Sequence, residues 1–103
     1  ESKRELAKLY QDQLKGTDLQ FVIEPKDCRS NYWLNAVRCE DKKHRNELLK
    51  KTNENNVMTR PIWGLMHDQK MYAECRRGLL INSEWLAERV VNLPSSVVNN
   101  KPT

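Results

Sequence analysis

Thr59-Arg60-Pro61-Ile62-Trp63, followed by Leu65-Met66-His67 and Met71-Tyr72, is the most informative stretch of this 103-residue chain. Pro61 fixes its own φ near −65° and drives Arg60 toward extended backbone, so the guanidinium has a defined direction. A fixed guanidinium with aromatic neighbours is a good receptor for a phosphate attached to a ring-shaped group. The alternative is an edge strand whose arginine simply faces water.

The hydrophobic pattern around this stretch predicts an α+β fold. Helical spacing of Leu6, Leu9, Tyr10 and Leu14 precedes Gly16, where a helix would stop. The predicted elements in chain order are this first helix, strands over 19–24 and 32–38, a helix over 42–54 capped by Asp41 and stopped at Asn55-Asn56, a strand over 57–63, a helical turn over 71–77, a helix capped by Asn82 or Ser83, and an edge strand at 93–95.

The order α-β-β-α-β-α-β predicts a small mixed or antiparallel sheet with helices covering one face. The last helix is expected to carry Trp85, Leu86, Ala87, Val90 and Val91 as its apolar side. Together with Leu6 and Leu9, this surface exceeds what a thin sheet needs, so we expect self-association at high concentration.

Composition indicates one small domain of a larger protein. Charged residues make up 31% and apolar residues 38% of the chain, so the core is thin. Glu1 already lies within a helical pattern without a starting Met, which indicates a piece cut from a longer polypeptide. We expect a domain over 1–97 and a fraying tail over 98–103. No apolar run approaches a membrane helix, and no signal peptide is recognisable.

Three cysteines, Cys28, Cys39 and Cys75, are odd in number and lack CxxC spacing. Reduced thiols in a cytoplasmic protein are the simplest interpretation. A metal site from Cys39, His44 and His67 would match no zinc pattern.

A net charge of +4 raises the question of nucleic acid. The densest basic runs, 42–45 and 50–51, lie on the predicted second helix and are interrupted by Asp41, Glu47 and Glu54. Mixed charge on a helix is typical of a solvated face and not of a phosphate-tracking stripe, so we expect no nucleic-acid partner.

Four stretches in order resemble the carboxy-terminal domain of the DegT/DnrJ/EryC1/StrS family, the pyridoxal-phosphate-dependent sugar aminotransferases. The likeness covers about residues 4 to 97 and is greatest to members acting on nucleotide-linked 4-keto-hexoses. The stretches are Ser30-Asn31-Tyr32-Trp33-Leu34-Asn35, Leu48-Leu49-Lys50-Lys51-Thr52-Asn53-Glu54-Asn55, Thr59 through Tyr72, and Ala87-Glu88-Arg89-Val90-Val91-Asn92-Leu93-Pro94-Ser95-Ser96.

The resemblance implies that the lysine holding pyridoxal phosphate lies in a large amino-terminal domain. No matching lysine motif or phosphate cradle is found here, so this chain alone is expected to be inactive and to bind no cofactor. The implied partners are that large domain, a nucleotide sugar and a second subunit. The implied role is amino-sugar biosynthesis for surface polysaccharide.

Positions carried over from the family implicate five residues in substrate binding and none in catalysis. Arg60 would meet the diphosphate or sugar, and His67 would lie on a loop facing the cleft. The remaining three are Tyr32, Trp33 and Tyr72. Core packing stays open for Tyr32 and Trp33, and an exposed loop position stays open for His67.

Gln69-Lys70 stand where close relatives commonly have Leu-Pro, which loosens the loop and adds a positive charge. A basic interaction module or a self-associating structural piece remains an alternative function.

Overall fold

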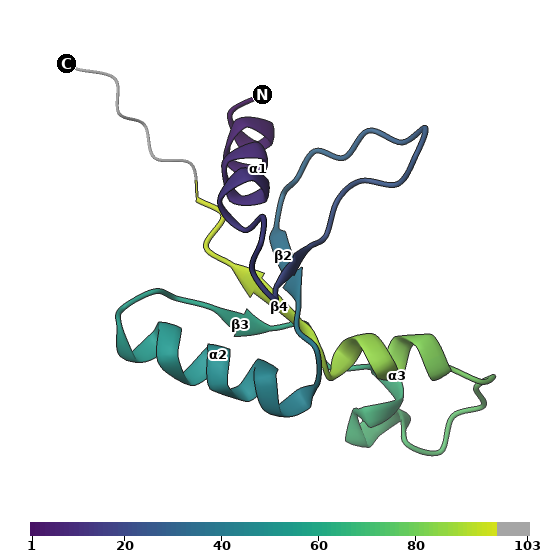
Figure 1. The fold of residues 1–103 in the computed structure, drawn as a ribbon. Coiled ribbons are helices and arrows are strands. Elements are labelled where there is room, and N and C mark those ends of the chain that lie inside the picture. The colour runs from purple at the N-terminus through teal and green to yellow at the C-terminus, as the bar shows by residue number, and fades with distance from the viewer. Residues whose placement is uncertain (97–103) are drawn as a thin grey trace.

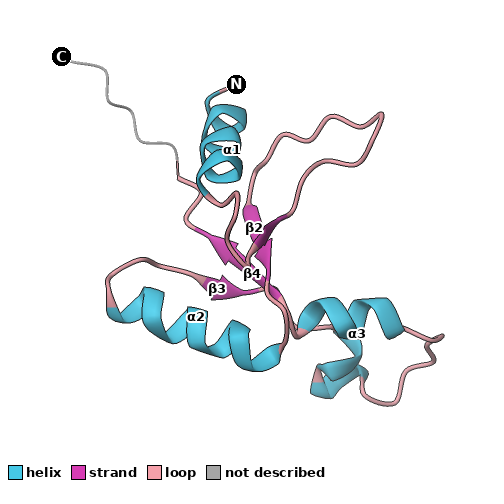
Figure 2. Ribbon diagram, viewed as in Figure 1, coloured by secondary structure: helices cyan, strands magenta, loops and turns pink. Residues whose placement is uncertain are grey.

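A computed structural model describes residues 1–96 of the chain. Its elements surround a four-stranded antiparallel sheet of order β1-β2-β4-β3 (Figures 1 and 2). In chain order they are α1 (Ser2–Gln13), β1 (Gln20–Phe21), β2 (Asn35–Arg38), α2 (Lys42–Glu54), β3 (Arg60–Pro61), the short 3₁₀ turns η1 (Met66–Asp68) and η2 (Lys70–Tyr72), α3 (Ile81–Ala87) and β4 (Val90–Leu93). The predicted α+β class with a small antiparallel sheet is confirmed.

The core lies where β2 and β4 meet. Val37 pairs with Val91 across the two strands, and both are fully buried. Because side chains alternate along a strand, these two and Phe21 face the same side of the sheet. Leucines from the α1–β1 connection and from α2 cover them: Leu14, Leu19, Leu48 and Leu49. The core is as thin as composition predicts.

Two local signals work as predicted. The Asp41 side chain accepts a hydrogen bond from His44 N at 2.7 Å and begins α2. Gly16, with φ +80°, and Asn56, with φ 64°, take the left-handed backbone that ends the predicted helices.

Val90 and Val91 were predicted on the last helix, and this is wrong. They begin β4, which pairs with β2 on one side and β3 on the other. The prediction of an edge strand at Leu93-Pro94-Ser95 is also wrong, because β4 is an interior strand that ends before Pro94. Consecutive β-branched valines are suited to a strand buried in the sheet, and Pro94 terminates it.

The predicted caps of the last helix are likewise wrong. α3 begins at Ile81 behind Leu80, and no side chain caps it. Asn82 and Ser83 lie inside the helix.

The other strands are shorter than predicted because local hydrogen bonds compete with pairing. Ser30 Oγ and Asn31 Oδ1 accept bonds from the backbone N–H groups of Tyr32 and Trp33, and Tyr32 is left-handed with φ 49°. β2 therefore begins at Asn35. Val57 N donates to Thr52 O at 2.8 Å, which closes α2 and delays β3.

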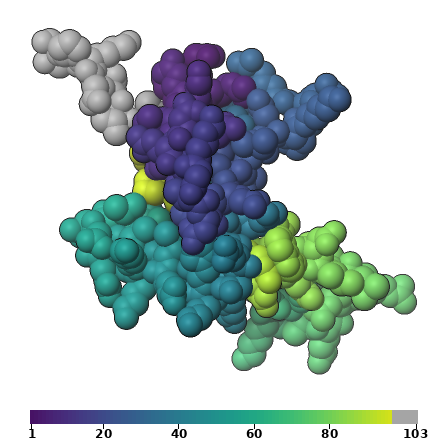
Figure 3. All heavy atoms as spheres, in the orientation of Figure 1, coloured from purple at the N-terminus to yellow at the C-terminus, as the bar shows by residue number. Residues whose placement is uncertain are grey.

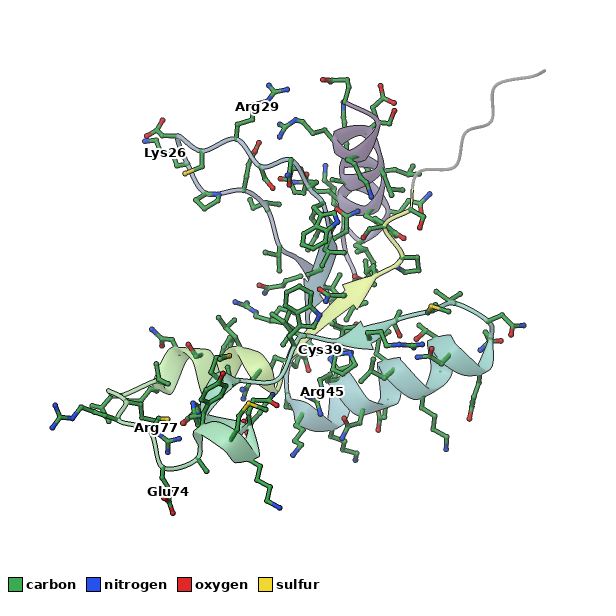
Figure 4. All side chains as sticks on the ribbon, turned by 180° about the vertical axis from the view of Figure 1, so that it is seen from behind. Lys26, Arg29, Cys39, Arg45, Glu74 and Arg77 are labelled. Atoms are coloured by element: carbon green, nitrogen blue, oxygen red, sulfur yellow. The ribbon has the colours of Figure 1, made fainter. Side chains whose placement is uncertain are left out.

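Two segments project from the sheet (Figures 1 and 3). The hairpin between β1 and β2 carries Lys26 and Arg29 near its tip, as Figure 4 shows. The segment between β3 and α3 forms a separate lobe that carries η1 and η2. We call residues 65–83 the α3 lobe. The expected tail over 98–103 lies outside the described residues.

Candidate functional site

Arg60 lies on the edge strand β3, opposite Asn92 of β4. Its Nη1 donates to Asn53 Oδ1 at 3.1 Å and to Thr59 O at 2.8 Å, while the residue stays exposed. Asn53 is in turn held by bonds from its Nδ2 to Leu49 O and to Thr59. The guanidinium therefore has a defined direction and remains open to solvent.

Trp33 lies beside Trp63, which follows β3. The two indoles meet edge to face at 6.3 Å between centroids, with 68° between their planes. Both are mainly exposed, at 61% for Trp33 and 69% for Trp63. Exposed tryptophans in contact form an apolar surface that water covers poorly, which is typical of a binding face.

Tyr32 is placed elsewhere, against α1. Its hydroxyl accepts a hydrogen bond from Glu24 N at 3.0 Å, and its ring stacks on Phe21. The Arg4 guanidinium lies over the same ring, 5.4 Å from its centroid. Arg4 also binds both carboxylate oxygens of Glu24 at 3.0 Å. Tyr32 thus helps to fasten the hairpin to α1.

The ion pair between Arg4 and Glu24 lowers the pKa of the Glu24 carboxyl group. The hydrogen bonds from the guanidinium, with a further bond from Ser30 N, lower the pKa of Glu24 from 4.5 to about 2. The hairpin is therefore clamped to α1 throughout the neutral range.

His67 and Tyr72 meet in the α3 lobe, where they line a cavity of about 340 Å³. Leu65, Met66 and Leu80 supply apolar wall, and the polar lining includes Ser83. The His67 side chain is only 10% exposed, with Nε2 3.4 Å from Glu84 Oε1 and 3.6 Å from Asp68 Oδ1. His67 therefore lines the cavity, and its Nε2 lies close to two carboxylates.

The five predicted site residues thus fall in different places. The structure brings His67 and Tyr72 to one cavity, places Trp33 against Trp63, fixes Arg60 at the sheet edge, and uses Tyr32 against α1.

Sequence reasoning missed Cys75, Arg76 and Arg77, which also line the cavity. Adjacent arginines directly before Gly78 are the signal that identifies them.

Two hollows of the described chain lack the groups that pyridoxal phosphate needs. An aldimine needs a lysine amine inside a pocket, and no lysine lines the α3-lobe cavity. Lys8 borders a hollow beside α1, but Glu1, Glu5, Asp12 and Glu24 border it too, and four carboxylates repel a phosphate.

A metal site is equally unsupported among residues 1–96, where no group of three His, Cys, Asp or Glu side chains is placed to hold an ion. Cys39 is buried, and burial raises the pKa of its thiol. His44 instead accepts a bond from Glu40 N at Nδ1 and lies 3.5 Å from Asp18 through Nε2. Within the same residues no helix has the length and apolar character to cross a membrane.

The antiparallel sheet with its surrounding helices is a fold shared with solved aminotransferases. The model of the DegT/DnrJ/EryC1/StrS aminotransferase family matches residues 1–101, and the chain belongs to that family.

Curated relatives agree over nearly the whole chain. The chain is 31% identical over 93 residues to the GDP-perosamine synthase of Escherichia coli O157:H7, covering 90% of the chain and 25% of the relative. It is 30% identical over 99 residues to the GDP-perosamine synthase of Vibrio cholerae, covering 91% and 26%. The chain therefore spans about a quarter of the length of these relatives.

Solved structures agree on the fold. The aminotransferase TlmJ from Streptoalloteichus hindustanus superposes with a TM-score of 0.77 at 25% identity, covering 90% of this chain and 25% of that one. DesV from S. venezuelae gives a TM-score of 0.78 at 24% identity, covering 91% and 26%.

Proposed function

We propose that this chain is the carboxy-terminal substrate-cleft domain of a pyridoxal-phosphate-dependent aminotransferase that acts on a nucleotide-linked 4-keto-hexose. Family membership and coverage of one quarter of the relatives support a domain role. The names of the two curated relatives specify a GDP-linked sugar, which supports a nucleotide sugar as substrate class. The product would serve amino-sugar biosynthesis for surface polysaccharide.

The observation that carries this proposal is an exposed pair of indoles in a domain whose edge strand also holds an exposed, directed arginine. Trp33 and Trp63 expose most of their surface, and Arg60 is exposed on the neighbouring edge strand. A domain that worked alone would be expected to bury more of the two tryptophans. A large amino-terminal domain packed here would close a cleft around them, and a homodimer of the complete polypeptide would be the working unit.

The residues of this chain bind and orient in this scheme, and none is catalytic. When bound in the rest of the polypeptide, pyridoxal phosphate supplies the electron sink of transamination. Arg60 would hold the substrate's diphosphate or sugar by paired hydrogen bonds. His67 and Tyr72 would border the substrate from the α3 lobe, and Trp33 would exclude water from the cleft.

A lysine test decides where the cofactor is held. The 103-residue chain, mixed with pyridoxal phosphate and reduced with borohydride, is expected to show no stoichiometric adduct at any single lysine. The reading frame upstream of Glu1 is expected to encode the lysine that does form one. A one-to-one adduct within residues 1–103, or an upstream frame without such a lysine, would overturn the proposal.

The alternative of a basic interaction module receives less support from the contacts. Two of the basic residues at the start of α2 are engaged internally: Arg45 Nη1 donates to Ala87 O at 3.0 Å, and His44 faces Asp18. Figure 4 places Arg45 next to the buried Cys39, where α2 begins.

A further inference from the structure

The α3-lobe cavity has a wall suited to one flat ring. Its volume of about 340 Å³ is near the lower end of the roughly 300–1,000 Å³ typical of ligand pockets, so a single ring-sized group fills it. Leu65, Met66 and Leu80 give apolar wall, and the Tyr72 ring adds an aromatic surface. The polar lining includes His67, Ser83, Arg76 and Arg77. A flat nucleobase suits the apolar and aromatic part of the wall.

Two arginines that line the same cavity have no anionic partner among the described residues. Arg76 and Arg77 both line it, and neither has a hydrogen-bond or ion-pair partner within residues 1–96. Every other arginine in the described chain has an oxygen partner: Arg4, Arg29, Arg38, Arg45, Arg60 and Arg89. Two consecutive arginines without a partner among the described residues, both lining one cavity, are suited to binding phosphate groups.

The lining of the cavity contains two arginines and no carboxylate, so its edge presents positive charge to a ligand. Glu84 and Asp68 both approach the His67 imidazole from outside the lining. Glu74 belongs to the same turn as the arginines but does not line the cavity. Figure 4 shows Arg77 and Glu74 projecting from this lobe, far from the hairpin tip that carries Lys26 and Arg29.

We propose that the α3-lobe cavity binds the nucleoside diphosphate end of the substrate, with the base against Tyr72 and the diphosphate on Arg76 and Arg77. This inference rests on the proposed function for its substrate class. It assigns Arg60 to the sugar end of the molecule and makes the 65–83 segment the part of this domain that selects the nucleotide.

Cysteine alkylation tests this assignment on the complete 103-residue chain. Cys75 lines the cavity and Cys28 lies on the distant hairpin, and both thiols are exposed. Each thiol is labelled with iodoacetamide in the presence of GDP, guanosine or inorganic diphosphate, and mass spectrometry measures the rate of labelling. GDP is expected to slow labelling of Cys75 in a saturable way and to leave Cys28 unchanged. Guanosine and diphosphate are expected to need at least about tenfold higher concentration, because each lacks half of the contacts.

Matched charge variants supply the control. Arg76→Gln with Arg77→Gln is expected to weaken GDP protection about tenfold or more, the effect of losing charge-assisted hydrogen bonds. Lys26→Gln with Arg29→Gln removes the same charge from the hairpin tip and is expected to leave protection unchanged. Labelling of the buried Cys39 would reveal an unfolded variant. If the double glutamine variant at Arg76 and Arg77 proves unfolded, Arg76→Lys with Arg77→Lys takes its place.

Three results would overturn the nucleotide assignment: no protection of Cys75, equal protection by diphosphate alone, or equal loss in both charge variants. Each is independent of the proposed function, which depends on the lysine upstream of Glu1. If GDP protects Cys75 but no such lysine is encoded upstream, the assignment of the cavity stands and the proposed aminotransferase function is rejected.

Discussion

At the scale of single residues, some arginines join elements of the molecule to one another, whereas others remain open to solvent. Arg4 joins α1 to the hairpin through Glu24 and also donates to Ser30 O at 2.6 Å. Arg89 stacks on Trp85 at 4.3 Å and donates to Glu40 O, so it joins α3 to the start of α2. Arg60, by contrast, combines a fixed direction with exposure, which is what a ligand-binding arginine needs.

Arg60→Ala is expected to weaken nucleotide-sugar binding by the complete enzyme by about 1.5–3 kcal/mol, the range for a hydrogen bond to a charged group. Arg60→Lys is expected to recover only part of this, since an ammonium lacks the planar fork. Melting temperature should barely change, because Arg60 is exposed on an edge strand. Calorimetry of both variants checks this, with Arg29→Ala on the hairpin as control. Full affinity in Arg60→Ala, or a large drop in its melting temperature, would return the residue to a structural role.

The Glu24 pair predicts an acid-sensitive contact. Because the folded-state pKa of Glu24 is lowered to about 2 from 4.5, its contribution to stability is complete above pH 4.5 and is lost as pH falls toward 2. Glu24→Gln should be less stable than the parent at neutral pH and should lose less stability across this window. Urea unfolding at several pH values measures both, with the exposed Glu47→Gln as control. An equal loss of stability in the parent and in Glu24→Gln between pH 4.5 and 2 would contradict this account.

At the scale of elements, local signals place helix ends well and strand ends poorly. Asp41, Gly16 and Asn56 act through bonds and backbone angles within their own turn, so their effect is readable from sequence. Strand length instead depends on a partner chain segment. The first strand was predicted over 19–24, but β1 covers only Gln20–Phe21, and Val22 N adds one further bond to Ala36 O at 2.9 Å.

Asp41→Ala is expected to cost about 1 kcal/mol of stability, the usual effect of losing a helix N-cap. Asp41→Asn keeps an oxygen acceptor and is expected to stay close to the parent. Urea unfolding of both proteins separates the cap from any effect of charge. Equal destabilisation by the two substitutions would mean that the carboxylate acts by charge and not as the acceptor for His44 N.

At the scale of the whole molecule, the exposed apolar surface agrees only in part with the one the sequence predicts, because Leu9, Trp85 and Leu86 are exposed as expected and the two valines are not. Val90 and Val91 are buried in β4, at 5% and 0% exposure. The exposed apolar surface includes Trp33, Trp63 and Leu34 near the sheet, together with the α3 lobe. The part beside the sheet is the surface that would meet the large domain proposed above.

The isolated chain is therefore expected to self-associate at high concentration through the tryptophan pair. Sedimentation velocity should reveal mass that rises with concentration, and a hydrophobic dye should bind. Trp33→Ser with Trp63→Ser should lower both signals, while Leu79→Ser, at an exposed position of the α3 lobe, serves as control. A monomer at millimolar concentration that binds no dye would refute the expectation.

What the sequence by itself determined is the family, the α+β class, the thin core, the first two helices and the open, directed Arg60. These follow from composition, from helical periodicity and from caps that act within a few residues. Only the tertiary structure decided that Val90-Val91 form an interior strand, that Tyr32 contacts Arg4 of α1, and that His67, Tyr72, Arg76 and Arg77 line one cavity. The physical reason is that strand pairing and the contact between Arg4 and Tyr32 join residues distant in sequence, while the cavity depends on how the 65–83 segment folds back on itself, and no local pattern records either.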